Sequence, residues 1–274
     1  MVEEIISKAP VFLLVAVRCL ALIMTMPLLS SRSISRRAKI ALAAYMAYFI
    51  TPQLSLSTGP FADYQSYIAL DGSFTLEYIL LLIGEALIGV IIGFYITTIF
   101  AAFSTAGQFF AFQMGFSASE AYDALSQVEN PLMGQFLNYT GMLIFLQNHW
   151  FQNIFLGGLV SSFKTINCFA IVQHSDKLLR FMLGSLTTLF ADALVIALPL
   201  MGTLFLINVT MGILSKAAPT MNLLSEGFPI LIMTAFFVIA LILPNLCELF
   251  TSSFIDGFRQ IQLLLRQLSA EGSL

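Results

Sequence analysis

The chain has 274 residues, of which 58% are hydrophobic and only 10% are charged. Soluble domains carry about 25% charged residues, so this composition excludes an ordinary soluble protein and predicts an integral membrane protein. The formal net charge of −3 and the scattered Lys and Arg residues argue against nucleic acid as a partner.

The first apolar segment predicts a retained membrane span rather than a cleaved signal peptide. Glu3 and Glu4 precede Lys8, so the amino-terminal region lacks the basic character of a signal peptide. The apolar run from Val11 to Leu29 is interrupted by Arg18 and has no clear small-residue cleavage site. We therefore expect this run to remain in the mature protein.

Six or seven apolar segments predict an all-α, polytopic membrane protein built of helical hairpins, with one domain over residues 1–274. A helix needs about 20 residues to span the hydrocarbon core. The segments at 76–106 and 180–214 are longer, so each is either one tilted helix or a hairpin. Pro199 and Gly202 offer a break in the second. The segments are 10–29, 38–56, 76–106, 131–147, 150–163, 180–214 and 226–250.

The charges of the connectors predict the orientation of the chain. Residues 30–39 are rich in Arg and Lys, so the positive-inside rule places this connector in the cytoplasm and the amino terminus outside. Residues 57–75 contain no Lys or Arg, which suits the outer side. Arg259 and Arg266 favour a cytoplasmic carboxyl terminus, which requires an odd number of crossings.

Three charged residues lie inside apolar runs: Arg18, Glu85 and Asp192. Charge inside a membrane is costly, so such residues normally face the bundle interior or water and pair with one another. One hypothesis is an ion pair of Arg18 with Glu85 or Asp192 that fixes helix packing. The other is a substrate or proton pathway.

Gly89 and Gly93 form a GxxxG pattern in the third apolar segment. Two glycines at this spacing let another helix approach closely. The pattern is common in apolar helices, so it predicts helix packing and does not indicate a particular function.

The stretch from Gly107 to Phe116 is too apolar for an ordinary connector and too interrupted for a span of its own. It carries four Phe and one Met, broken by two Gln and two Gly. Such a segment needs a surface to pack against. That surface is either the core of the protein or the inside of a pore that must stay shut.

The last predicted element is an amphipathic helix at about 254–268. Apolar residues recur there at helical spacing, with Asp256, Arg259 and Arg266 between them. This pattern is typical of a helix that lies against a membrane surface or a partner.

The sequence argues against an enzyme. His149 and His174 lie on separate connectors, and no zinc-protease, nucleophile-elbow or nucleotide-binding motif occurs. The three cysteines, Cys19, Cys168 and Cys247, are far apart and form no CxxC pattern, so neither a disulfide framework nor a zinc site is expected. We expect no catalytic residue, no metal ligand and no cofactor.

Short motifs form an ordered set along the chain, although none of them is specific by itself. They are Gly84–Phe94 (GEALIGVIIGF), Ala106–Gln108 (AGQ), Gln113–Ala118 (QMGFSA), Asn148–His149, Ala197–Leu200 (ALPL), Leu214–Asn222 (LSKAAPTMN) and Gly227–Pro229 (GFP). Their order resembles the FliR family of flagellar export-gate proteins, whose injectisome relatives are the SctT proteins. The resemblance runs from the first span to about residue 250.

This resemblance implies a core subunit of the flagellar type III protein export gate in the bacterial inner membrane and flagellar basal body. Family members form the protein-conducting channel with FliP and FliQ, as part of a helical assembly. FlhB wraps the cytoplasmic entrance and FlhA surrounds the base. The implied substrates are unfolded rod, hook and filament proteins, and the energy comes from a partner ATPase and the proton gradient.

The resemblance also implies an apolar plug inside the pore, at about Gly107 to Ser117. Its apolar surface would be Phe109, Phe110, Phe112, Met114 and Phe116, with Gly107 and Gly115 as hinges. Flexible Met and movable Phe suit a seal that must deform around any substrate, and an apolar constriction can also gate by dewetting. Ordinary helix packing remains the alternative for this cluster.

Three rival hypotheses stay open. The first is an injectisome export-apparatus subunit of the same family. The second is a small proton-coupled transporter that uses the three buried charges, although the sequence shows no inverted repeat. The third is a membrane scaffold that forms no conduit.

Overall fold

The computed structural model describes residues 2–31, 34–54, 59–68, 75–114, 132–217 and 223–270, and all regular structure in these ranges is helical. The elements are α1 (Val2–Thr25), α2 (Pro27–Ser30), α3 (Arg36–Ile50), η1 (Thr51–Gln53), η2 (Ala62–Tyr64), α4 (Leu76–Gln113), α6 (Leu132–Gln147), α7 (Trp150–Asn153), η4 (Ile154–Val160), α8 (Ser161–Thr165), α9 (Cys168–Gln173), α10 (Ser175–Ala217) and α11 (Leu223–Ala270). The predicted all-α class is confirmed.

Among the described residues, three helices are long and apolar enough to cross a membrane. They are α4, α10 and the Pro229–Ser269 part of α11. The apolar part of α1, Ala9–Thr25, is shorter. The chain is therefore a polytopic membrane protein, as its composition predicts.

Each of the two overlong apolar segments forms one continuous helix. α4 has 38 residues and covers 76–106 without a break. α10 has 43 residues and continues through Pro199 and Gly202. The hairpin alternative is therefore wrong for both segments. Membrane helices tolerate such residues because neighbouring groups and local adjustments re-satisfy the backbone.

The described residues form two compact units. Unit 1 comprises Met1–Thr98, His149–Ser185 and Ile255–Leu274. Unit 2 comprises Ile99–Asn148 and Leu186–Phe254. The helices α4, α10 and α11 each contribute residues to both units. The description of residues 1–274 as a single domain stays a prediction.

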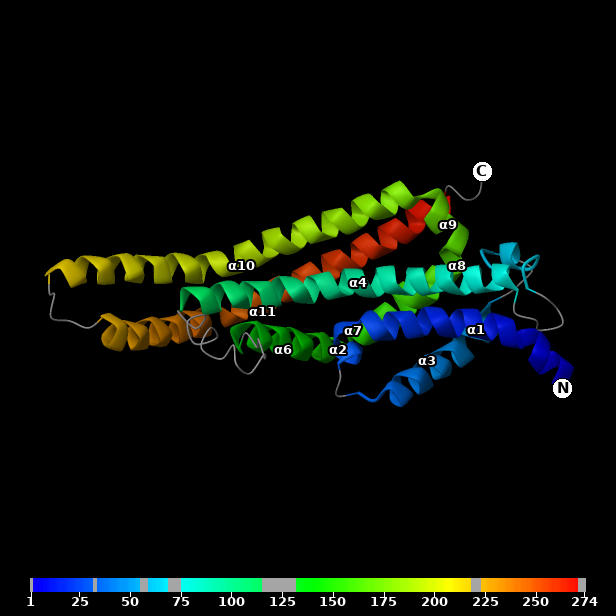
Figure 1. Ribbon diagram of the computed structural model, residues 1–274, viewed down its shortest axis with the longest axis horizontal. Coiled ribbons are helices and arrows are strands. Elements are labelled where there is room, and N and C mark those ends of the chain that lie inside the picture. The colour runs from blue at the N-terminus through cyan, green and yellow to red at the C-terminus, as the bar shows by residue number, and fades with distance from the viewer. Residues whose placement is uncertain are drawn as a thin grey trace. The chain divides into compact units, whose positions relative to one another are not determined.

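In unit 1, α1 packs against α3, and the short helix α2 joins them (Figure 1). The Ser35 hydroxyl accepts a hydrogen bond from the Ala38 N–H at 3.3 Å and caps the start of α3. The Lys39 side chain is buried and donates to the carbonyls of Ser30 and Ser31, both at 3.0 Å. One lysine of the basic connector thus satisfies the carbonyl groups that end α2.

In unit 1, α1 and the last part of α11 both pack against the first half of α4. The Tyr78 hydroxyl near the start of α4 donates to the Pro10 carbonyl of α1 at 2.8 Å. The last part of α11 lies beside the same half of α4, because Leu264 and Leu268 line a narrow apolar cavity with Ile88. The expected placement of the two termini on opposite sides of a membrane stays a prediction.

The stretch 254–268 is the last part of α11 rather than a separate helix. Its buried residues include Ile261, Leu264, Leu265 and Leu268, all of which line the apolar cavity of unit 1. Within unit 1, this apolar side therefore packs against α4 and α10 of the same chain.

The core of unit 2 is aromatic. The Phe250 ring lies 5.3 Å from that of Phe100 and 4.7 Å from that of Phe103, measured between centroids. The Phe145 ring packs against Phe100 at 5.6 Å and against Phe254 at 5.2 Å. A Cβ added to Gly141 would lie 2.8 Å from the Phe250 ring, so this α6 position must stay small.

Candidate functional site

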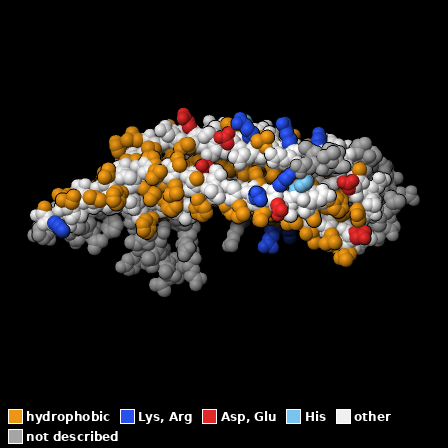
Figure 2. Space-filling view, turned by 90° about the horizontal axis from the view of Figure 1, so that it is seen from above, with side chains coloured by type: hydrophobic (Ala, Val, Ile, Leu, Met, Phe, Trp, Pro, Cys, Tyr) orange, Lys and Arg blue, Asp and Glu red, His pale blue; other side chains and the backbone are white. Residues whose placement is uncertain are grey.

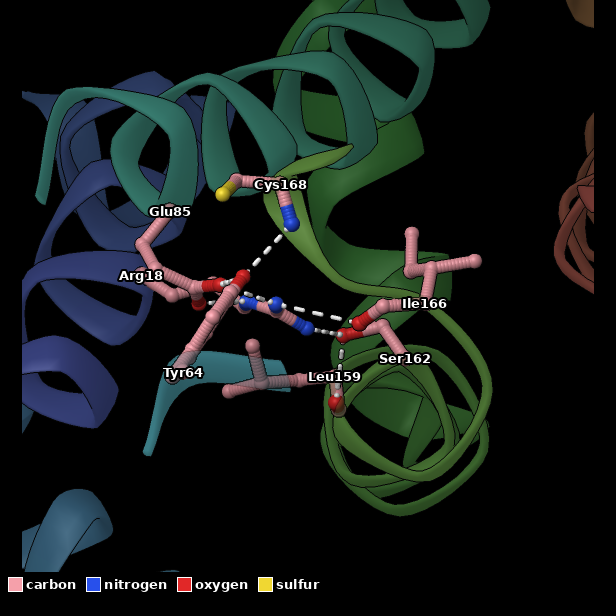
Figure 3. Close-up of polar contacts among 7 residues, drawn as sticks. All are labelled: Arg18, Tyr64, Glu85, Leu159, Ser162, Ile166 and Cys168. Atoms are coloured by element: carbon pink, nitrogen blue, oxygen red, sulfur yellow. Dashed lines mark hydrogen bonds and ion pairs between the residues drawn. The ribbon is translucent and has the colours of Figure 1, made fainter. Parts of the chain in front are cut away.

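Two of the three predicted buried charges meet in unit 1. Arg18 on α1 and Glu85 on α4 are both fully buried and face each other (Figure 3). Arg18 Nε donates to Glu85 Oε2 at 2.7 Å, and Nη2 donates to Oε1 at 2.8 Å. This bidentate geometry is the strongest arrangement available to an arginine and a carboxylate. The structure therefore gives Arg18 the partner Glu85, one of the two that the sequence offered.

The rest of the guanidinium is also satisfied. Nη1 donates to the Ser162 hydroxyl at 3.0 Å, and Nη2 also donates to the Ile166 carbonyl at 3.3 Å (Figure 3). The Arg18 Cζ atom lies 4.2 Å from the centre of the Phe163 ring, which adds a cation–π contact. A buried ion pair is tolerated only when such hydrogen bonds replace the lost water.

A π-helical segment brings Ser162 to the arginine. The segment η4 joins α7 to α8, and the Ser162 hydroxyl donates to the Leu159 carbonyl inside it at 2.7 Å. On another face of η4, a Cβ added to Gly157 would lie 2.6 Å from the Phe258 ring of α11. π-helical turns are rare and often occur at functional sites. Here the turn holds Ser162 beside Arg18 while η4 packs closely against α11.

Tyr64, which the sequence did not single out, completes the network. The Tyr64 hydroxyl donates to Glu85 Oε1 at 2.6 Å and accepts the Cys168 backbone N–H at 2.5 Å (Figure 3). Burial raises the pKa of the Tyr64 phenol far above its usual value, and the Glu85 charge raises it further, so the phenol keeps its proton. Burial likewise raises the pKa of the Cys168 thiol. An aromatic residue in a polar connector gives no periodic signal from which this role could be predicted.

The GxxxG glycines let α4 approach α1 directly beside the ion pair. A Cβ added to Gly89 would collide with the Arg18 carbonyl and lie 2.9 Å from Ala21 Cβ. A Cβ added to Gly93 would collide with the Thr25 hydroxyl. The Thr97 hydroxyl donates to the Thr25 carbonyl at 2.8 Å, which links the same two helices one turn further on. The two glycines thus set the helix separation at which Arg18 reaches Glu85.

Asp192 does not join this network. It lies on α10 in unit 2, is half-buried, and has no ion-pair partner in the described part of the chain. The structure therefore separates the three predicted charges into a closed pair and an acid without a cation.

The predicted plug begins as helix rather than loop. Residues 107–113 form the end of α4, and a Cβ added to Gly107 would lie 2.5 Å from Gly134 Cα on α6. Phe110 and Met114 are fully buried, Phe109 is half-buried, and Phe112 is 70% exposed. Gly115 and Phe116 lie outside the described residues. The helical period explains the division, because Phe110 and Met114 stand four residues apart on one face.

The network can hold helices together and leaves neither oxygen of Glu85 without a hydrogen bond. Glu85 is fully buried and accepts three hydrogen bonds, which occupy both of its oxygens. Within the described ranges, no three His, Cys, Asp or Glu residues are grouped so that they could hold a metal ion. His149 precedes α7 with a φ of 54°, and His174 ends α9, so the two histidines belong to different elements.

Comparison with known proteins gives a match over most of the chain. Residues 9–256 match the bacterial export proteins, family 1. The chain is 30% identical over 259 residues to the flagellar biosynthetic protein FliR of Pectobacterium carotovorum subsp. carotovorum, which covers 93% of this chain and 92% of that protein. It is 30% identical over 239 residues to FliR of Bacillus subtilis (strain 168), covering 86% and 87%. It is 27% identical over 173 residues to the surface presentation of antigens protein SpaR of Shigella flexneri, covering 61% and 64%.

Proposed function

The chain belongs to the bacterial export proteins, family 1, and from this premise we propose that it is a core subunit of the flagellar type III protein export gate. The match to flagellar relatives over most of both chains carries this proposal. The shorter match to SpaR favours the flagellar gate over an injectisome export apparatus.

In this proposal the chain forms the protein-conducting channel with FliP and FliQ in the inner membrane, at the flagellar basal body. FlhB and FlhA would be further partners, and unfolded rod, hook and filament proteins would be the substrates. The bare apolar surface of unit 2 supports a role inside an assembly. Phe205 on α10 and Met233 and Phe237 on α11 are 58%, 74% and 65% exposed, and such patches mark contact surfaces.

The buried network supports a structural role rather than proton transport. A proton carrier must exchange its proton with water or with another titrating group. Glu85 has no exposed surface, and Arg18 and Tyr64 occupy both of its oxygens. This saturation disfavours the proton-coupled transporter, and we assign Arg18 and Glu85 the task of locking α1 to α4.

The proposal also divides the predicted plug residues into two sets. Phe110 and Met114 would anchor the end of α4, because their side chains are fully buried. Phe112 would face the pore, because 70% of its surface is exposed at the end of α4. Phe109 is half-buried at the border between these sets. Gly115 and Phe116 keep the roles that the family resemblance implies.

Co-purification tests the gate proposal. The tagged chain, produced from its native operon and extracted in mild detergent, should elute together with FliP and FliQ as one large complex. Elution as a stable monomer that transports a small solute on its own in vesicles would overturn the proposal and support the transporter.

A conductance measurement tests the plug. Phe112→Ala in the assembled complex should raise ion leak through the closed gate, because the exposed ring is lost while the anchors remain. Phe136→Ala is the matched control, since Phe136 lies on α6 of the same unit and is 44% exposed. Equal conductance of the wild type and Phe112→Ala in assembled complexes would reject the plug role.

A further inference from the structure

The formal charge of the chain is divided unequally between its two units. Of the twelve Lys and Arg residues eleven belong to unit 1, and of the fifteen Asp and Glu residues six belong to unit 2. Unit 1 therefore carries a formal charge of +2 and unit 2 of −5. Unit 2 contains a single cation, Lys216, at the last turn of α10. Lys216 lies about 36 Å along α10 from Asp192, at about 1.5 Å per residue, so it cannot pair with it.

Asp192 belongs to one continuous face of α10, which we call the α10 seam. Its positions recur every three or four residues, which places them on one side of a helix. The α10 seam consists of Asp192, Val195, Pro199, Thr203, Leu206 and Thr210. Val195 is 56% exposed and Leu206 is 66% exposed, so the described residues of unit 2 leave these two positions of the face open. Figure 2, which looks onto α10, shows hydrophobic side chains along this part of the helix and few charges among them.

Asp192 is the one group of the α10 seam that lacks a hydrogen-bonding or charged partner in the described chain. The Thr203 hydroxyl donates to the Pro199 carbonyl and the Thr210 hydroxyl to the Leu206 carbonyl, both at 2.8 Å. Both threonines are thus satisfied within α10 and suit an apolar environment. Among the described residues, the Asp192 side chain forms neither an ion pair nor a hydrogen bond, and a carboxylate on a lipid-facing surface is costly. Contact with lipid alone would therefore leave the Asp192 carboxylate without a partner.

The two threonines of the α10 seam and Gly202 beside it suit close contact with another helix. A Cβ added to Gly202, beside Pro199 and Thr203, would meet nothing within 4 Å, so the backbone is accessible there. Helix contacts in membranes favour small residues and Thr, because they let backbones approach closely. The open space at Gly202 and the unpaired Asp192, about three turns earlier on α10, together describe a surface for one helix that carries a cation.

We propose that the α10 seam binds a membrane helix of another subunit whose Lys or Arg side chain pairs with Asp192. This inference rests on the proposed function, because it needs a partner subunit, and it adds the chemistry of the contact. Unit 2, whose one cation is Lys216, would then obtain a second cation from the helix of the partner subunit. Asp192 would fix the register of the two helices, while Val195 and Leu206 would supply apolar contact area.

Charge variants test the pair. Asp192→Lys should lower the recovery of the native complex about tenfold or more, because two cations then meet in a desolvated contact, and Asp192→Asn should lower it less. Asp256→Lys is the control, since the Asp256 carboxylate is 65% exposed on α11. Recovery of both Asp192 variants at the wild-type level would overturn the inference. Failure of the wild-type chain to recover any partner would instead defeat the proposed function.

Photocrosslinking in the otherwise wild-type chain does not depend on the folding of a charge variant. A photoreactive amino acid at Val195 or Leu206 should crosslink to a second protein in the native complex. Crosslinks to lipid only, in a complex that is otherwise intact, would overturn the inference.

Selection for restored recovery of Asp192→Lys should yield a partner in which one Lys or Arg has become acidic. Restoring changes confined to this chain would contradict a pair between subunits.

Discussion

The two units solve the problem of buried polar groups in opposite ways. In unit 1, Arg18 and Glu85 are fully buried, and Ser162, Tyr64 and the Ile166 carbonyl complete their hydrogen bonds. In unit 2, the interior is a cluster of phenylalanine rings, and Asp192 on α10 lies about 36 Å along the helix from Lys216, the one cation of its unit. The buried charges Arg18 and Glu85 of unit 1 are thus paired within the unit, whereas Asp192 of unit 2 has no ion pair among the described residues.

This difference shows where a membrane subunit can carry charge without a partner. A buried ion pair is stable only if its remaining donors and acceptors are matched, which needs several elements around it. Unit 1 has those elements, because α1, α4, η2 and α8 converge on the Arg18–Glu85 pair. In unit 2 no comparable set of donors is described around Asp192, which has no ion pair among the described residues.

Removing the buried charge of Arg18 should have the largest effect on the stability of the chain. Arg18→Met leaves Glu85 buried with only the Tyr64 phenol, and we expect a loss of about 3–5 kcal/mol in the free energy of unfolding. Denaturant titration of the chain purified in detergent measures this. The control Arg259→Met breaks an exposed contact of 3.6 Å with Asp256 and should cost less than about 1 kcal/mol.

The double variant Arg18→Met with Glu85→Leu separates the structural role from transport. Removing both charges removes the penalty of an unpaired buried charge, so most of the stability should return. A double variant as unstable as Arg18→Met alone would contradict the structural role.

Opening the aromatic core of unit 2 comes next. Phe250→Ala removes the ring that contacts Phe100, Phe103 and Gly141, and should cost about 3–4 kcal/mol through lost burial and a cavity. Phe237→Ala on the same helix is the control, because Phe237 is 65% exposed, and it should change the unfolding free energy by less than about 0.5 kcal/mol. Similar losses in both variants would show that the ring cluster is not the core of this unit.

Removing one hydroxyl from the closed network should have an intermediate effect. Tyr64→Phe keeps the ring but takes the third hydrogen bond from Glu85 and the acceptor from the Cys168 N–H, at a cost of about 1–3 kcal/mol. Tyr67→Phe in the same connector is the control, since Tyr67 is 36% exposed and should be near neutral. If both variants unfold at the same denaturant concentration as the wild type, the network does not need Tyr64.

The smallest effect on stability is expected at the exposed plug position. Phe112→Ala should change the unfolding free energy by less than about 0.5 kcal/mol, because the ring is 70% exposed. Phe110→Ala, two residues earlier and fully buried, should cost about 3–5 kcal/mol. A reversed order of the two losses would contradict the division of this segment into anchors and a pore-facing ring.

Much of the fold and part of the site could be predicted from the sequence. Apolar runs separated by polar connectors placed the helices, because helix formation in a membrane depends on local composition. Arg18, Glu85 and Gly89 stood out for the same reason, since a charge or a GxxxG pattern inside an apolar run is visible without any contact. The sequence does not decide whether α10 is continuous, because Pro199 and Gly202 are compatible with a break and with an unbroken helix.

The sequence by itself determined that this is an all-α membrane protein of an export family, with charges that need partners. Only the tertiary structure decided that Arg18 pairs with Glu85, that Tyr64 closes the pair, and that Asp192 stands apart in unit 2. The physical reason is distance along the chain. Arg18 and Ser162 are 144 positions apart, and no local pattern records that two such residues meet. Composition and hydrophobic periodicity describe one or two helical turns at a time, whereas a buried network depends on how separate helices pack.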